Sequence, residues 1–388
     1  MDDFPAPTIG RPLQEEILES ESPSQIAAAT PETPAGDQSA DSPSASSQPL
    51  DEIYADDTNN QAPGGFDDRA TDVAAEITMA PANSLTTITL SAVGDLALGG
   101  DHEQGSFANF MKAFEANDCD YTYFLRNVKH IFDADDLTIG NLEGALTEAA
   151  DHKVKTFSLS GPPHFAKILS SSGVDVVSIA NNHTHDFFEA GYKDTAASLE
   201  AEDIGYFGNE FVTIIEVKGI RVGLLGFTFY SDSRAVRAQI SSAIKDLQSR
   251  DAQLIIAYYH WGREYGFIPD KYERDVAHFS IDNGADLVLG SHPHVIRGIE
   301  SYKGKNIVYS LGNFCFGANR NPADRHTFIY QYTFTFDDGV LMDGGEINII
   351  PAVISSARSY NNYQPRLAEG EEAERILRRI DEYSEGLK

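Results

Sequence analysis

The segment at 285–294 most constrains the fold, because an apolar run there ends in two closely spaced histidines. Ala285-Asp286-Leu287-Val288-Leu289 has the length and composition of a buried strand, and Gly290-Ser291 is typical of the turn that leaves it. His292-Pro293-His294 follows at once. Since α/β proteins place binding groups where the chain leaves the carboxyl end of a parallel strand, the segment predicts a parallel sheet with two imidazoles at its edge.

Four other apolar runs also end in carboxylate, amide or imidazole side chains. The runs at 87–92, 137–140, 174–180 and 253–259 lead into Asp95, Glu143, Asn182-His183 and His260. Helical patterns separate or follow the runs, at 107–114, 123–132, 163–171, 192–202, 235–247, 275–282 and 373–383. Alternating strands and helices predict an α/β fold with a mostly parallel central sheet.

Two segments near the C-terminal end have the pattern of paired strands. Residues 326–336 and 340–350 flank Asp337-Asp338-Gly339, which is typical of a hairpin turn. They predict a second, antiparallel sheet. The folded region is therefore expected to be a sandwich of two sheets flanked by helices.

Parallel strands bring their polar ends to one edge of a sheet. Carboxylates and imidazoles that converge away from water repel one another or lose hydration unless a cation or ligand joins them. Mixed oxygen and nitrogen donors suit Mn, Fe or Zn better than Ca, and we expect one or two such ions. The expected metal ligands are Asp95, Glu143, Asn182, His260, His292 and His294.

Two residues beside Asn182 are candidates for catalysis. His183 is expected to act as a general acid for a leaving group, and Asp186 to orient and tune that histidine. Taken singly, each polar strand end is also typical of a turn, a cap, an ion pair or a buried structural histidine. The prediction of a site therefore depends on their convergence.

The same segments resemble those of the CapA family of capsule-synthesis proteins, which is associated with poly-γ-glutamate. The domain of that family is similar to calcineurin-like metallophosphoesterases, so the resemblance implies a four-layer α/β/β/α sandwich. It covers about residues 87–350. The motifs that carry it are Val93-Gly94-Asp95, Gly140-Asn141-Leu142-Glu143, Ala180-Asn181-Asn182-His183-Thr184-His185-Asp186, His260-Trp261-Gly262-Arg263-Glu264, Gly290-Ser291-His292-Pro293-His294 and Ser310-Leu311-Gly312-Asn313-Phe314.

The resemblance also implies how the ligands divide between two metal sites. Glu143 stands where a bridging aspartate is usual, and one site, with Glu143, Asn182, His260 and His292, is complete. The other, with Asp95 and His294, is weaker. Phosphoesterases usually have Asp-x-His at the first motif, whereas Leu96-Ala97 follows Asp95 here. This departure disfavours ordinary two-metal phosphoesterase activity.

Four residues in or beside the motifs are expected to contact substrate. Arginine forks bind carboxylate and phosphate well, which makes an anionic polymer or a small anionic molecule the expected ligand. Surface ion pairing is the alternative for the charged members. The four residues are Arg263, Glu264, Arg297 and Asn313.

The first 86 residues differ in composition from the rest of the chain. They hold 17 acidic and 2 basic residues and are rich in Pro and Ser, which predicts a disordered acidic spacer at 1–86 before a folded domain at 87–388. The net charge of −31 argues against nucleic acid as a partner. Cys119 and Cys315 leave open whether a disulfide forms.

Three functions fit these features. The first is a cell-envelope hydrolase or transferase of the capsule type that acts on a γ-glutamyl amide, the second a metal-dependent phosphoesterase, and the third a non-enzymatic subunit that binds polymer. Membrane-embedded capsule synthesis proteins are expected partners. The expected location is the extracellular face of the envelope, with tethering by an N-terminal anchor that this sequence does not include.

Overall fold

The computed structural model describes residues 85–209 and 211–388. The predicted acidic spacer lies almost entirely outside the described residues, and its last two residues, Leu85 and Thr86, begin the first strand. Cys119 and Cys315 are both free, so they form no disulfide with each other. Among the described helices, none has both the length and the apolar character of a membrane span.

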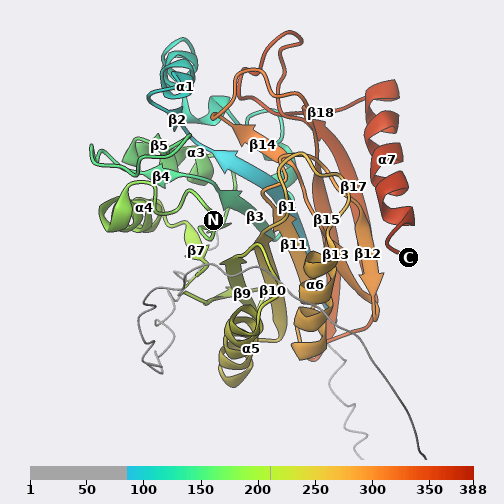
Figure 1. The fold of residues 1–388 in the computed structure, drawn as a ribbon. Coiled ribbons are helices and arrows are strands. Elements are labelled where there is room, and N and C mark those ends of the chain that lie inside the picture. The colour runs from blue at the N-terminus through green and yellow to red at the C-terminus, as the bar shows by residue number, and fades with distance from the viewer. Residues whose placement is uncertain (1–84, 210) are drawn as a thin grey trace, which may run out of the picture. The chain divides into compact units, whose positions relative to one another are not determined.

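Most strands of the described part of the chain belong to two large sheets (Figure 1). The nine-stranded sheet has the order β18-β17-β15-β1-β3-β6-β7, and β14 and β16 pair with β1 and β15. Its strands are β1 (Leu85–Ala97), β3 (Leu137–Leu142), β6 (Val176–Ser178), β7 (Gly205–Phe207), β14 (Asn313–Phe316), β15 (His326–Asp337), β16 (Val340–Leu341), β17 (Glu346–Val353) and β18 (Arg366–Leu367).

The six-stranded sheet has the order β12-β13-β11-β10-β9-β8, and a small third sheet has the order β2-β5-β4. The strands of the six-stranded sheet are β8 (Thr213–Val217), β9 (Ile220–Thr228), β10 (Leu254–His260), β11 (Leu287–Ser291), β12 (Ile299–Tyr302) and β13 (Lys305–Val308). The third sheet contains β2 (Gly100–Asp101), β4 (Ala145–Leu146) and β5 (Leu159–Gly161).

Helices connect many of the strands. The α-helices are α1 (Ser106–Glu115), α2 (Lys129–Phe132), α3 (Ala166–Ser170), α4 (Phe188–Ala201), α5 (Arg234–Ser249), α6 (Lys271–Asn283) and α7 (Gly370–Glu385). Two short 3-10 helices are η1 (Tyr121–Tyr123) and η2 (Pro163–Phe165).

An apolar core lies between the two large sheets. Leu90 of β1, Leu224 of β9 and Ile256 of β10 are fully buried in it, and burying such a side chain contributes about 1.5–3 kcal/mol. Separate apolar clusters cover the outer faces: Phe110 of α1 belongs to the cluster on the nine-stranded sheet and Ile240 of α5 to the one on the six-stranded sheet. The predicted α/β class is therefore confirmed.

Two predicted features of the fold are wrong. The late strands β15 and β17 do not form a separate sheet, because β15 pairs antiparallel with β1 inside the nine-stranded sheet. The helix expected at 123–132 is interrupted, and only η1 and α2 form there. The Asp120 side chain accepts a hydrogen bond from the backbone of Thr122, which holds the first turn in a tighter form.

Strand register brings the polar strand ends together. Asp95 of β1 lies opposite Asn141 of β3 on one side and Asn313 of β14 on the other. In the other sheet, His260 at the end of β10 lies opposite Ser291 of β11. Because the strands in each of these pairs are parallel, their carboxyl ends share an edge, as the sequence predicted.

Gly94 allows β1 to approach the turn before β14. A Cβ atom at Gly94 would lie 1.8 Å from the carbonyl oxygen of Gly312. That carbonyl accepts a hydrogen bond of 3.0 Å from the backbone of Asp95. Since the clash is with backbone, a side chain at position 94 displaces the strand that carries Asp95.

We expect Gly94→Ala to destabilise the protein by about 2–3 kcal/mol or more, because the backbone around Asp95 has to shift. Gly386→Ala is the matched control, since its Cβ would have no heavy atom within 4 Å. Urea unfolding of the two variants measures the difference. Equal midpoints would contradict the close approach.

Candidate metal centre

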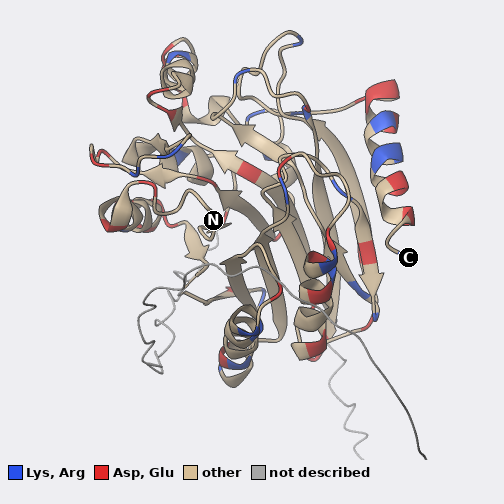
Figure 2. Ribbon diagram, in the orientation of Figure 1, with Lys and Arg blue, Asp and Glu red and all other residues tan. Residues whose placement is uncertain are grey.

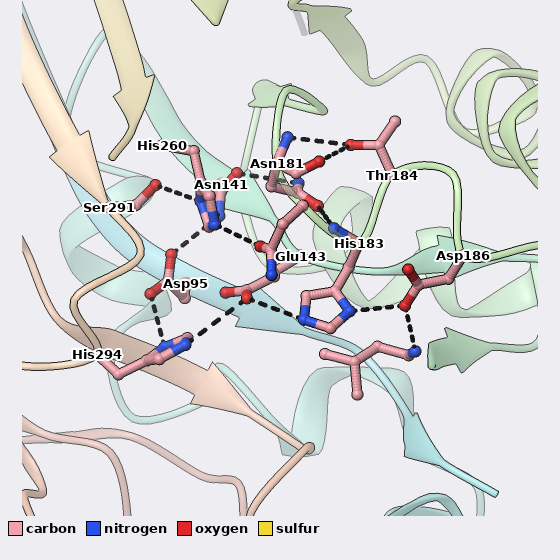
Figure 3. A network of polar contacts seen from close by, with 12 residues as sticks. Asp95, Asn141, Glu143, Asn181, His183, Thr184, Asp186, His260, Ser291 and His294 are labelled. Carbon is pink, nitrogen blue, oxygen red and sulfur yellow. Dashed lines mark hydrogen bonds and ion pairs between the residues drawn. The ribbon is translucent and has the colours of Figure 1, made fainter. Parts of the chain in front are cut away.

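The strand ends of both sheets form one polar cluster (Figure 3). Asp95 extends from β1 and Glu143 follows β3, whereas His183 and Asp186 lie on the segment between β6 and α4. His260 ends β10 in the other sheet. The carboxylates and amides thus come mainly from one sheet and several imidazoles from the other.

Asp95, Glu143 and His260 form a group that can hold a metal ion. Each offers a ligand atom, and these atoms lie within 4.8 Å of one another. All three side chains are buried, at 0–1% exposure. Asp95 Oδ2 and both carboxylate oxygens of Glu143 have no hydrogen-bond partner. Buried carboxylate oxygens without donors are costly, and a divalent cation would satisfy them.

Protonation of the side chains partly neutralises the negative charge of the cluster in the absence of a cation. Burial, reinforced by Asp95, raises the pKa of Glu143 to about 8. Burial alone would lower the pKa of His294, but the carboxylates of Glu143 and Asp95 outweigh it and raise that pKa to about 10. His294 Nδ1 lies 3.2 Å from Asp95 Oδ2, and its Nε2 lies 3.8 Å from Glu143 Oε1. A metal ion therefore has to displace protons here.

His260 and His292 are suited to be neutral nitrogen ligands. Burial holds the pKa of His260 well below its ordinary value and lowers that of His292 to about 4. Their ring centroids are 4.6 Å apart, and His292 Nδ1 has no hydrogen-bond partner. His260 Nε2 lies 2.7 Å from Asn182 Oδ1, so the side chains of Asn182 and His260 meet as predicted.

The backbone around Pro293 is held in an uncommon conformation. His292 has a φ of +93° and His294 a φ of +57°, a region that side-chain-bearing residues rarely adopt. Such strain is typical of sites where the surrounding fold fixes a side chain for function. It places one histidine beside His260 and the other beside Asp95.

His183 and Asp186 form a close pair at the edge of the cluster. His183 Nδ1 lies 2.6 Å from Asp186 Oδ2, which leaves Nε2 at 3.8 Å from Glu143 Oε1. Asp186 also accepts from the backbone of Leu159 and pairs with Lys155. Burial lowers the pKa of His183, although Asp186 opposes that shift. The contact with Asp186 fixes the orientation of the His183 ring.

Several residues that position the ligands were not predicted. Asn141 Nδ2 donates to Asp95 Oδ1 at 2.9 Å, and Asn181 Nδ2 donates to Asn141 Oδ1 at 3.2 Å. Both asparagines stand inside motifs noted above, and an amide at a buried strand end is the signal that could have identified them. Lys155 has no such signal, because it belongs to a loop remote from every motif.

A cavity of about 300 Å³ opens beside the cluster. Glu143, His183, His294 and Asn313 line it, and Asn313 Oδ1 lies 2.9 Å from His294 Nδ1. Glu264, which was predicted to contact substrate, lines the same cavity. The cavity therefore gives a substrate access to the predicted catalytic histidine.

The two predicted substrate arginines lie elsewhere. Arg297 is only 1% exposed, and its guanidinium pairs with Glu273 at 2.6 Å and donates to the carbonyls of Gly266 and Arg263. It has no free face for an anion, so that prediction is wrong. Arg263 forms an exposed ion pair with Asp270, which was the stated alternative.

Residues 89–318 match the family described as bacterial capsule synthesis protein PGA_cap. The chain belongs to this family. The match contains every predicted site residue, from Asp95 to Asn313. The predicted relationship to CapA proteins is therefore confirmed.

Individual relatives agree with the family match. The capsule biosynthesis protein CapA of Bacillus anthracis is 28% identical over 313 residues, which are 72% of this chain and 72% of that protein. The PGA biosynthesis protein CapA of Bacillus subtilis (strain 168) is 30% identical over 255 residues, 59% of this chain and 63% of that protein. A crystal structure of a hypothetical protein from Thermus thermophilus aligns with a TM-score of 0.39 and 17% identity, covering 68% of this chain and 99% of that one.

We expect Arg297→Met to destabilise this PGA_cap domain by about 3–5 kcal/mol, because Glu273 is left buried without its partner. Arg263→Ala, which removes an exposed ion pair, should change the free energy of unfolding by less than about 1 kcal/mol. Urea unfolding measures both. Similar small effects would indicate that Arg297 is free to bind a ligand after all.

We expect metal binding to release at least about one proton per ion at pH 7, because Glu143 and His294 retain protons in the free protein. Titration calorimetry with Mn²⁺ or Zn²⁺ in buffers of different ionisation enthalpy measures this number. Affinity should rise with pH, since deprotonation frees the ligands.

Glu143→Gln and His292→Ala should each lose bound metal while the domain stays folded, as judged by circular dichroism. His130→Ala, at an exposed position, is the control and should keep the metal of the unaltered protein. Unchanged metal content in both site variants would refute the ligand assignment.

Proposed function

We propose that this protein is a metal-dependent hydrolase or transferase of the cell envelope that acts on γ-glutamyl amides during capsule synthesis or processing. The observation that carries the proposal is the pair of buried carboxylates, Asp95 and Glu143, whose unpartnered oxygens lie beside His260. A histidine–aspartate pair, His183 and Asp186, adjoins them at an open cavity. Family membership supplies the polymer, since the CapA relatives are named for capsule and PGA biosynthesis.

The proposal includes a metallophosphoesterase-like fold. Two packed sheets with helices over their outer faces agree with a four-layer α/β/β/α sandwich of that type. The position of the donors at parallel strand ends supports the same assignment. This part of the proposal rests on the arrangement of elements within this chain.

We assign one ion, of Mn, Fe or Zn, to Asp95, Glu143 and His260, with Asn182 and His292 completing its shell. Carboxylate, amide and imidazole donors suit these metals. A second, weaker position would use His294 and Asp95, which now form an ion pair at 3.2 Å. A bound divalent cation supplies Lewis acidity toward a carbonyl or phosphoryl oxygen.

Residues of the chain itself then transfer the protons and orient the catalytic histidine. With Nδ1 held by Asp186, His183 presents Nε2 toward Glu143 and the cavity. Its lowered pKa favours the neutral ring, which can take a proton from the attacking water and return it to the leaving nitrogen. Water is consumed, the amide bond breaks, and a carboxylate and an amine are released.

The proposal also covers place and partners. The proposed location is the extracellular face of the envelope, and membrane-embedded capsule synthesis proteins are the proposed neighbours. An anionic polymer or a small anionic substrate is the proposed ligand.

We expect the metal-loaded protein to cleave a synthetic γ-glutamyl oligomer, and His183→Gln to lower kcat by about 10²–10⁴-fold while metal content is retained. Asp186→Asn should also lower kcat and shift its pH profile, because the ring loses its orienting carboxylate. His130→Gln is the control. Release of amine, measured by chromatography, reports the reaction.

Other outcomes of the same assay favour other functions. Phosphate release from an aryl phosphate that depends on His183, with no amide cleavage, would make the protein a phosphoesterase. Absence of metal after exposure to Mn, Fe and Zn, together with tight polymer binding, would indicate a non-enzymatic subunit.

A further inference from the structure

Two loops beside the metal cavity are fastened to each other. One is residues 317–325 after β14, and the other is residues 354–365 before β18. Asn361 Nδ2 donates to the carbonyls of Phe316 and Asn319, at 2.8 and 3.0 Å, and its backbone nitrogen donates to the carbonyl of Arg320. The relative position of the two loops is therefore fixed before any ligand binds.

These loops carry positive charge in an otherwise acidic chain. They contain Arg320, Arg325 and Arg358 but only one acidic residue, Asp324, whereas the whole chain has a net charge of −31. Asp324 is already paired with Arg379, at 2.6 Å. Figure 2 shows Lys and Arg on the loops near β14 and β18, in contrast to the acidic residues on many other segments.

Within the described residues, none of the three loop arginines forms an ion pair. Arg320 donates to the side-chain oxygen of Asn109 and lies over the ring of Tyr360, 5.4 Å from its centroid. Arg325 donates to the carbonyl of Arg358. No carboxylate of the described residues therefore compensates their guanidinium charges, which leaves these charges available for an anion.

The arginines line two neighbouring cavities. Arg320 lines the cavity of about 300 Å³ that also contains Glu143 and His183. Arg325 and Arg358 line a second cavity of about 690 Å³, and Pro322 belongs to both. Arg366, in the second cavity, is already paired with Glu372. The two cavities therefore adjoin at Pro322, and the first of them borders the metal cluster.

We propose that Arg320, Arg325 and Arg358 form a binding track for a chain that carries repeated carboxylates. Each guanidinium can receive a carboxylate through two parallel hydrogen bonds. Two cavities that meet at Pro322 fit a polymer segment better than a single small anion. The identity of the chain as γ-linked glutamate rests on the proposed function. The three arginines lie beyond residues 89–318, so the family match assigns them no role.

The test compares binding of fluorescently labelled γ-glutamate oligomers of about 3 and about 12 residues, by anisotropy. The full chain is used after metal removal on a chelating resin, which prevents turnover. We expect the longer oligomer to bind about tenfold more tightly, since it reaches both cavities. The double variant Arg325→Gln/Arg358→Gln should abolish this gain, and Arg320→Gln should weaken both oligomers by about tenfold.

Arg234→Gln, at an exposed position on α5, is the matched control and should bind both oligomers like the unaltered protein. Thermal unfolding shows whether each variant is folded. Equal affinity of the unaltered protein for both oligomers, or an unchanged length dependence in the double variant, overturns the track. Equal weakening of both oligomers in the double variant also overturns it, in favour of a single-anion site.

The same data separate the track from the proposed function. Arginine-dependent binding without cleavage in the metal-loaded protein leaves the track standing and removes the hydrolase. Cleavage of the oligomer, together with binding that is unchanged in the double variant, supports the hydrolase and removes the track. Displacement of the oligomer by a single-stranded oligothymidylate of similar length at equal concentration overturns a track for carboxylates, because it shows a general site for polyanions.

Discussion

The burial of two carboxylates, of whose four oxygens only Asp95 Oδ1 accepts a hydrogen bond, is the constraint on which the rest of the site depends. Removing a carboxylate from water costs several kcal/mol even after relaxation, and Asp95 and Glu143 are both at or below 1% exposure. Nearby His294 compensates part of this charge, and protonation compensates more. Of the groups that could offset this cost, the carboxylate, amide and imidazole donors favour a bound cation.

The two-sheet architecture determines how that cluster is assembled. β1 and the residue after β3 supply the carboxylates, whereas β10 and the chain after β11 supply His260, His292 and His294. The apolar core between the sheets fixes the distance between these two groups. Close approach at Gly94 and the hydrogen bond from Asp95 to Gly312 then set the position of the first carboxylate.

The local charge distribution is compatible with the proposed binding of an anionic polymer by an acidic protein. The chain has a net charge of −31, but the loops after β14 and before β18 present three arginines that pair with no carboxylate of the described residues. Local charge, rather than net charge, governs binding within a Debye length of about 8–10 Å. Arg297 is the opposite case, since its buried guanidinium is already paired with Glu273.

The sequence by itself determined the strands and their polar ends, because apolar runs and the residues that follow them are local properties of the chain. It therefore predicted His260, His292 and Glu143 as neighbours. Only the tertiary structure decided which strands pair, and it placed β15 beside β1 instead of in a separate sheet. It also decided that Arg297 is structural and that Asn141 and Asn181 position Asp95. Hydrogen-bond partners and burial arise between segments distant in sequence, so no local pattern encodes them.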